Sequence, residues 1–244
     1  MADPIVVDLS HYQPTPDWQK LKAAGVVGVI LKCTDGAGYV DPTFASRYDA
    51  AIAAGLAVST YHFLRPGNIQ TQMNFYLNTL KPRNGERLCL DHEDAGVTLK
   101  ELEQAVAYLQ TDSRDIQVTV YSGHLIKDQL RDGYSDVLAM TSLWIAQYTS
   151  ANAPSWPIGT WPDWTLWQYT DKATVSGISG PVDGNKFNGS AENCGKWLGP
   201  ATSGPAPEPA EDLSLVVALS QPGAPPPKSI KVSVTWNGEI MVAP

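Results

Sequence analysis

The sequence predicts an α/β fold in which a sheet of mainly parallel strands closes into a barrel. Short apolar runs alternate with amphipathic stretches five times between residues 5 and 131, and this alternation is typical of parallel strands joined by crossover helices. Between residues 142 and 183, strand-like runs follow one another with only loops between them. No Gly-x-Gly-x-x-Gly follows the first apolar run, so a closed barrel is favoured over an open dinucleotide-binding sheet.

The first half of the chain predicts five strand–helix units. The expected strands are residues 5–8, 26–32, 56–63, 87–93 and 116–121, and helices follow at about 17–24, 42–54, 70–80, 98–109 and up to 131. Asp41 and Pro42 are typical of an N-cap and a first helical turn, and Gly55 is typical of a helix end. Thr98 and Glu101 have the spacing of a capping box.

The second half predicts strands with few helices. Three runs, at residues 142–148, 164–169 and 177–183, are separated by loops rich in Pro and Trp. Together with the first five strands they predict an irregular TIM-like (β/α)5(β)3 barrel. Active sites of such barrels lie at the C-terminal ends of the strands. Several carboxylates and tyrosines stand at the predicted ends, namely Asp8, Tyr61, Asp91 with Glu93, Tyr121 and Asp183. We therefore expect these side chains to converge.

The predicted strand at residues 87–93 ends in two carboxylates. Asp91 and Glu93 are two residues apart, and side chains on a strand alternate, so both should point to one face about 6.6 Å apart. Two carboxyl groups in unlike surroundings are the usual equipment for cleaving a glycosidic bond, one as an acid and one as a charged partner. The alternative interpretation of Asp91 and Glu93 is a solvated strand end.

Composition limits the classes of partner and cofactor. The net charge is −8 without a basic patch, so neither nucleic acid nor an anionic membrane is an expected partner. Cys33, Cys89 and Cys194 are too few for a disulfide framework, and no Cys/His cluster predicts a metal or other cofactor. The chain starts without a signal-peptide pattern and has no membrane-length apolar run. We expect synthesis in the cytoplasm and action outside it only after release.

Eight short segments follow one another along residues 5–198 in a recognisable order. They are Val7-Asp8-Leu9-Ser10-His11-Tyr12-Gln13, Leu31-Lys32-Cys33-Thr34-Asp35-Gly36, Tyr61-His62-Phe63, Leu90-Asp91-His92-Glu93, Val120-Tyr121-Ser122, Leu143-Trp144-Ile145-Ala146-Gln147-Tyr148, Leu166-Trp167-Gln168-Tyr169 and Val182-Asp183-Gly184-Asn185-Lys186-Phe187. With these segments the sequence resembles the glycoside hydrolase family 25 lysozymes, the Chalaropsis-type muramidases that many phages use as endolysins. Each segment alone is weak evidence for this family, but eight segments in the same order along the chain are specific to it.

The resemblance implies an N-acetylmuramidase that cleaves the β-1,4 bond between N-acetylmuramic acid and N-acetylglucosamine in bacterial peptidoglycan, with a phage endolysin's role in host lysis. It implies that Glu93 is the general acid and Asp91 its partner, with Asp8 and Asp183 as further acids of the pocket. The substrate-binding set that it implies is Tyr61, Tyr121, Trp167, Gln168, Asp35 and Tyr169. The sequence departs from the family where Asp35 replaces a common Glu and where wall-binding repeats are absent from the tail.

Two courses of hydrolysis remain open. Glu93 must be neutral to protonate the leaving oxygen, and neighbouring acids should raise its pKa. Asp91 could then assist the substrate's own acetamido group as nucleophile, which retains the anomeric configuration, or a carboxylate could activate water, which inverts it. We favour the first course because the bound sugar carries the acetamido group.

Two other function classes compete with this prediction. His11, His62, His92 and His124 lie at or after predicted strands, as ligands of a metal-dependent wall-sugar hydrolase or deacetylase would. Strand alternation points His92 away from Asp91 and Glu93, however, and no element supplies a pair of histidines at ligand spacing. The other class is a wall-binding barrel without catalysis, for example in a phage particle.

The organisation of the chain is predicted as three parts. Residues 1–199 form the catalytic barrel, residues 200–212 a Pro/Ala-rich linker, and residues 213–244 a small β-rich segment. In the last part, Asn237-Gly238 between β-rich runs is a strong hairpin signal. So short a segment buries little core, so we expect self-association or attachment to the wall.

Overall fold

A computed structural model describes residues 5–199, 233–236 and 239–242. The chain divides into two compact units, Met1–Pro207 and Glu208–Pro244, and each is described by itself. The predicted linker at 200–212, the rest of the tail up to residue 232 and the turn Asn237-Gly238 lie outside the described residues.

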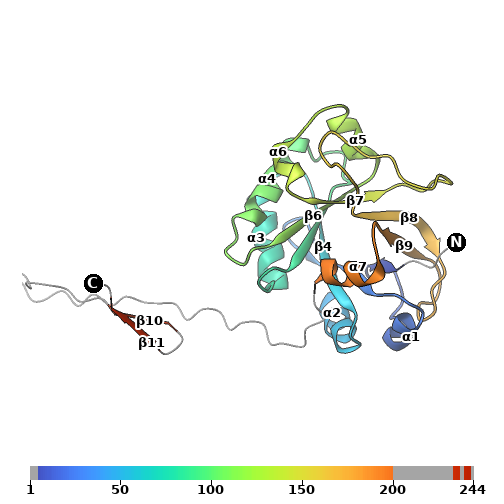
Figure 1. The fold of residues 1–244 in the computed structure, drawn as a ribbon, viewed down its shortest axis with the longest axis horizontal. Helices are drawn as coiled ribbons and strands as arrows, with labels where there is room; N and C mark the ends of the chain where they lie inside the picture. The colour runs from blue at the N-terminus through green and yellow to red at the C-terminus, as the bar shows by residue number, and fades with distance from the viewer. Residues whose placement is uncertain (1–4, 200–232, 237–238, 243–244) are drawn as a thin grey trace, which may run out of the picture. The chain divides into compact units, whose positions relative to one another are not determined.

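The first unit is built on a nine-stranded sheet that closes on itself (Figure 1). Its strands are β1 (Val6–Leu9), β2 (Gly28–Asp35), β3 (Tyr39–Val40), β4 (Ala57–Phe63), β5 (Arg87–Asp91), β6 (Gln117–Ser122), β7 (Ser142–Ala146), β8 (Leu166–Ala173) and β9 (Val182–Phe187). The order is β1-β9-β8-β7-β6-β5-β4-β2-β3, and pairing of β1 with β2 closes an eight-stranded barrel that leaves β3 outside it. The predicted irregular α/β barrel is confirmed.

The first unit has seven described helices, and the first five lie where the sequence signals place them. The seven are α1 (Trp18–Ala23), α2 (Phe44–Ala53), α3 (Ile69–Leu80), α4 (Leu99–Gln110), α5 (His124–Leu130), α6 (Asp136–Ala139) and α7 (Ala191–Leu198). Thr98 and Glu101 form the expected capping box of α4. Asp41, the expected N-cap of α2, lies before the helix, and its Oδ1 accepts a hydrogen bond from the backbone N–H of Thr43 at 2.9 Å.

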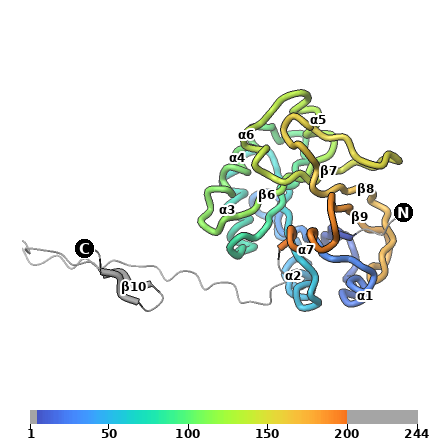
Figure 2. The backbone as a smooth tube through the Cα atoms, viewed as in Figure 1, coloured from blue at the N-terminus to red at the C-terminus, as the bar shows by residue number. Residues whose placement is uncertain are grey.

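Alternating strand residues divide the core into an inner and an outer cluster. Along β1, Val6 belongs to the inner cluster and Val7 to the outer one, as period-two alternation requires. The outer cluster fills the space between strands and helices, and the inner cluster fills the barrel. Side chains of α7 join the inner cluster through Cys194 and Leu198, and Figure 2 shows this helix, in orange, against the barrel.

Helix α7 was not predicted, and it closes the end of the barrel at which the parallel strands begin. Arg87, the first residue of β5, donates a hydrogen bond from Nε to the carbonyl of Trp197 at 2.7 Å, and its guanidinium lies 4.4 Å from the Trp197 ring centroid. With this end closed, the opposite end, where the parallel strands finish, is left for a pocket.

Several predicted strand boundaries are wrong, and β2 and β8 run past their predicted ends to Asp35 and Ala173. Strand β5 ends at Asp91 and leaves Glu93 in the following loop. Strand β9 covers 182–187, not 177–183, and runs antiparallel to both β1 and β8. Short elements β3 and α6 were not predicted either.

The second unit contains the hairpin that Asn-Gly predicts. Strand β10 (Ser233–Trp236) pairs antiparallel with β11 (Glu239–Val242), and Trp236 lies opposite Glu239. Among the described residues of both units, none of the helices combines the length and the hydrophobicity that crossing a membrane requires.

Candidate active site

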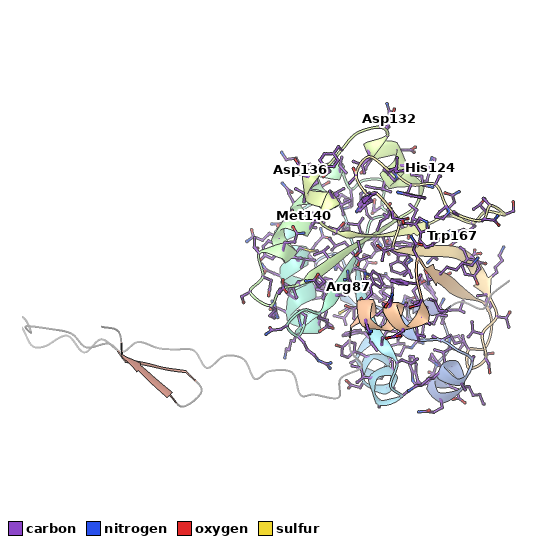
Figure 3. All side chains as sticks on the ribbon, viewed as in Figure 1. Arg87, His124, Asp132, Asp136, Met140 and Trp167 are labelled. Carbon is purple, nitrogen blue, oxygen red and sulfur yellow. The ribbon has the colours of Figure 1, made fainter. Side chains whose placement is uncertain are left out.

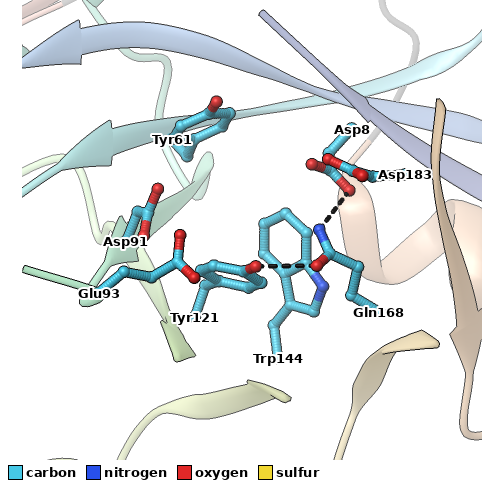
Figure 4. A pocket seen from close by; sticks show the side chains of 8 residues that line it. All are labelled: Asp8, Tyr61, Asp91, Glu93, Tyr121, Trp144, Gln168 and Asp183. Carbon is cyan, nitrogen blue, oxygen red and sulfur yellow. Dashed lines mark hydrogen bonds between the residues drawn. The ribbon is translucent and has the colours of Figure 1, made fainter. Parts of the chain in front are cut away.

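Eight side chains line a polar pocket at the end of the barrel where the parallel strands finish (Figure 4). They come from seven of the eight barrel strands and from the loop after β5, and they are Asp8, Tyr61, Asp91, Glu93, Tyr121, Trp144, Gln168 and Asp183. The sequence predicted five carboxylates and tyrosines at strand ends. All five therefore meet in this pocket, together with Glu93. The shared cause is alternation, because each strand turns every second side chain into the barrel.

Asp183 reaches the pocket for a different reason from the one that the sequence suggested. It is the second residue of β9, not the last residue of a strand. Because β9 is antiparallel to β1, its beginning lies beside the end of β1, and Asp183 stands opposite Asp8 in the register. Two carboxyl groups from neighbouring strands are thus side by side, as Figure 4 shows.

Two amide side chains hold the carboxyl group of Asp8. Gln168 Nε2 donates to Asp8 Oδ2 at 3.0 Å and Asn185 Nδ2 donates to the same oxygen at 2.8 Å. Asn185 is itself oriented by Trp144, whose indole Nε1 donates to Asn185 Oδ1 at 2.7 Å. Both donors converge on Oδ2 of Asp8, and Asp8 also interacts with the side chain of Asp183.

Gln168 is also fixed from its other side. Its Oε1 accepts hydrogen bonds from the hydroxyls of Tyr121 and Tyr148, each at 2.8 Å. The amide orientation is therefore determined, with Nε2 toward Asp8. Tyr121 packs on Trp144 with 4.4 Å between ring centroids, so this side of the pocket is a continuous network of rings and amides.

Asp91 and Glu93 form the opposite wall, and they differ in surroundings. Asp91 is buried and its Oδ1 has no hydrogen-bond partner, whereas Glu93 is exposed at the mouth. Between them His92 is buried, with Nε2 2.9 Å from Gln129 Oε1. The expectation that His92 points away from the two carboxylates is confirmed, although Glu93 itself lies beyond the strand.

The four carboxyl groups all have pKa values above their ordinary range. Burial raises the pKa of Asp91 well above its ordinary value, and the charge of Glu93 adds to the effect. Burial, and to a smaller extent the neighbouring Asp8, raise the pKa of Asp183 to about 8. Burial also raises the pKa of Asp8 and of Glu93, although hydrogen bonds oppose the rise in both. At neutral pH the pocket therefore holds protons that it can donate.

Three residues of the predicted substrate-binding set are not in the pocket lining. Asp35 forms ion pairs with Lys32 Nζ at 2.8 Å and Arg65 Nε at 2.7 Å. Although burial would raise its pKa, these partners lower it. Trp167 is 2% exposed and belongs to the outer cluster, and Tyr169 packs 6.0 Å from it between ring centroids. Trp167 does not line the pocket, because its neighbour Gln168 points into the barrel.

The predicted site omitted three residues that line the pocket or support its lining. They are Trp144, Asn185 and Tyr148. Trp144 and Tyr148 stood in a recognised segment, and Asn185 stood two residues after Asp183. Alternation was the available signal, because a residue two positions from an inward-facing one on the same strand also faces inward.

None of the four histidines of the metal-dependent alternative lines the pocket. His62 is buried and lies within hydrogen-bonding distance of Thr34, at 2.8 Å, and of Gln72. His124 is paired with Asp128 on the surface. Within the part of the chain that the structure describes, no group of His, Cys, Asp and Glu is arranged to hold a metal ion.

The chain is similar to known proteins in both sequence and structure. The sequence model of glycosyl hydrolases family 25 matches residues 7–178. Lysozyme M1 of Streptomyces globisporus is 29% identical over 203 residues, which are 76% of this chain and 68% of that protein. A solved bacterial lysozyme from Streptomyces coelicolor superposes with a TM-score of 0.67 and 27% identity, and the match covers 79% of this chain and 95% of that one. The CTP1L endolysin matches with a TM-score of 0.63 and 25% identity, over 79% of this chain and 69% of its own.

Proposed function

Since the chain belongs to glycosyl hydrolase family 25 and is a glycoside hydrolase, we propose that it is an N-acetylmuramidase. Its substrate is bacterial peptidoglycan, and it cleaves the β-1,4 bond between N-acetylmuramic acid and N-acetylglucosamine. The observation that carries the proposal is the pairing of a buried Asp91 with an exposed Glu93 in one polar pocket. Two carboxyl groups in unlike surroundings divide the roles of acid and charged partner.

Glu93 is the general acid. Its side chain is exposed at the mouth, where the leaving oxygen of a bound strand is within reach, and desolvation by the surrounding pocket residues raises its pKa. A neutral carboxyl can protonate that oxygen as the bond breaks. Since Asp91 also has a raised pKa, the pair keeps a proton to a higher pH than two ordinary carboxyl groups would.

Asp91 assists the acetamido group of the sugar. Its buried Oδ1 lacks a partner within the described chain, so it can accept a hydrogen bond from the acetamido N–H. Such a bond favours the charged form of Asp91 and leaves the proton on Glu93. The acetamido oxygen then attacks the anomeric carbon while the glycosidic oxygen takes the proton from Glu93. Water later opens the cyclic intermediate with retention, and the proton that this water loses returns to the Glu93 carboxylate.

The test is the release of reducing ends from purified peptidoglycan by the wild type and by Glu93→Gln, with the new ends identified. Wild type should produce reducing muramic acid ends, and Glu93→Gln should lose at least ~100-fold of this activity. Glu192→Gln, which removes an exposed carboxylate from α7, is the matched control and should retain activity. Release by Glu93→Gln at the wild-type rate would remove Glu93 from the mechanism, and an initially inverted anomer would remove the acetamido route.

We further propose that the enzyme is made in the cytoplasm of a phage host and acts as an endolysin once released. The likeness to the CTP1L endolysin supports this context. Expression inside a bacterium should cause lysis only when a membrane-permeabilising protein is co-expressed. Lysis without that protein would contradict the need for release.

We also propose that the hairpin unit mediates self-association. The described hairpin has only two strands, and an isolated two-stranded hairpin is marginally stable without additional packing. Light scattering should give more protomers per particle for the full chain than for a chain ending at residue 199. Equal protomer numbers would contradict the proposal.

A further inference from the structure

Three aromatic side chains form a cluster outside the pocket, at the same end of the barrel. His11 and Tyr12 follow β1, and Tyr39 is on β3. The His11 and Tyr12 rings have centroids 4.1 Å apart, and those of His11 and Tyr39 are 6.1 Å apart. Tyr12 is 82% exposed and Tyr39 40%, so the cluster presents ring surface to solvent.

Buried polar groups hold this aromatic cluster in place. Asp41 is buried, and its Oδ2 accepts a hydrogen bond from the His11 backbone N–H at 2.8 Å and lies 3.0 Å from His11 Nδ1. The buried guanidinium of Arg47 donates to the carbonyls of Ser10 and Gln13. The loop that carries Tyr12 is therefore anchored on both sides, and a ring held in advance loses little freedom when it binds a ligand.

Lys32 lies between the aromatic cluster and the pocket lining. Lys32 Nζ lies 5.8 Å from the Tyr39 ring centroid. On β2, Lys32 is opposite Tyr61 in the register, and Tyr61 lines the pocket. Lys32 and Arg65 are paired with Asp35 and Asp94, so the two positive and two negative charges beside this path balance.

We propose that Tyr12, supported by His11 and Tyr39, binds a pyranose ring of the glycan strand beyond the two sugars at the cleaved bond. This inference rests on the proposed function, which places a polymer in the pocket. A polymer must leave the pocket along the surface, and the apolar face of a pyranose stacks on an exposed aromatic ring. A path with little net charge suits a neutral sugar better than a charged peptide.

The test is calorimetric titration of peptide-free glycan strands into the full chain. Glu93→Gln is the parent, so that the strand stays intact, and an octasaccharide is compared with the disaccharide. When Tyr12→Ala is added to this parent, octasaccharide binding should weaken about three- to tenfold relative to the parent, and disaccharide binding should stay unchanged. Tyr12→Phe keeps the ring and should bind like the parent. Tyr134→Ala, which removes another exposed tyrosine (62%) between α5 and α6, should also have no effect.

The outcomes separate this inference from the proposed function. If the wild type cleaves peptidoglycan but Tyr12→Ala binds the octasaccharide as the parent does, the aromatic subsite is refuted and the muramidase stands. If the wild type does not cleave but octasaccharide binding depends on Tyr12, the muramidase is refuted and the subsite stands. Equal weakening of both sugars by Tyr12→Ala, or no octasaccharide binding by the parent, also refutes the subsite.

Discussion

Replacing Asp183 with asparagine should make the protein more stable at pH 8 relative to the wild type than at pH 5. Burial and the neighbouring Asp8 raise the pKa of Asp183 from 3.8 to about 8. A carboxyl group whose pKa is higher in the folded chain contributes stability that is fully present below the unfolded pKa. That contribution is lost as the pH rises through the window from 3.8 to about 8, because the folded chain must give up a proton that the unfolded chain has already lost.

The size of the effect follows from the shift. A change from 3.8 to about 8 corresponds to ~6 kcal/mol at ~1.4 kcal/mol per pH unit. Because the Asp183 side chain is partly accessible to water, solvent screening reduces this value, and we expect ~2–3 kcal/mol between pH 5 and pH 8. Asparagine is neutral throughout this range and keeps a donor for Asp8, so the variant should lack this part of the loss.

Urea unfolding of the full chain at pH 5 and pH 8, followed by tryptophan fluorescence, measures the difference. The control is Asp132→Asn, which removes an exposed carboxylate at the periphery, outside the pocket (Figure 3), and it should keep the pH dependence of the wild type. If Asp183→Asn loses as much stability between the two pH values as the wild type does, the raised pKa is not a property of the folded protein. Hydrolytic activity should fall in Asp183→Asn, because the folded chain holds this carboxyl group in the pocket although it lowers the stability.

Two further predictions concern residues that support the pocket. Asn185→Ala leaves the buried indole N–H of Trp144 without its acceptor and should lower the free energy of unfolding by ~2–4 kcal/mol in urea titrations, whereas a loss under ~1 kcal/mol would show that the amide is dispensable. Arg65 holds Asp94, the residue after Glu93, at 3.2 Å. Since this ion pair is half exposed, Arg65→Ala should change stability by less than ~1 kcal/mol but lower kcat up to about tenfold by loosening the Glu93 loop. Arg65→Lys should recover part of kcat, and an unchanged kcat in Arg65→Ala would contradict the positioning role.

Much of the fold follows from local patterns. The capping box at Thr98 and the apolar runs of β2 and β4 depend on residues within one element, so their physical cause is present in the sequence. The same holds for Asp8, Tyr61 and Asp91, which stand at the ends of such runs and reach the pocket. A strand end at one edge of a parallel sheet needs only alternation to place its side chain.

Other features depend on contacts between distant segments. The eight residues of α7 enclose the barrel end through Cys194 and Leu198, and nothing within that short segment indicates what it covers. The direction of β9, which brings Asp183 to Asp8, is decided by pairing with β1 and β8. The role of Asn185 depends on an indole from β7, 41 residues earlier.

The sequence by itself therefore determined the α/β barrel, the end at which the site lies and most of its acidic groups, because side-chain alternation and helix capping act over a few residues. Only the tertiary structure decided that Trp167 faces outward, that Trp144 faces the pocket and that two amides converge on one oxygen of Asp8. Those arrangements arise from closure of the barrel, which selects the neighbours of each strand by long-range pairing and packing.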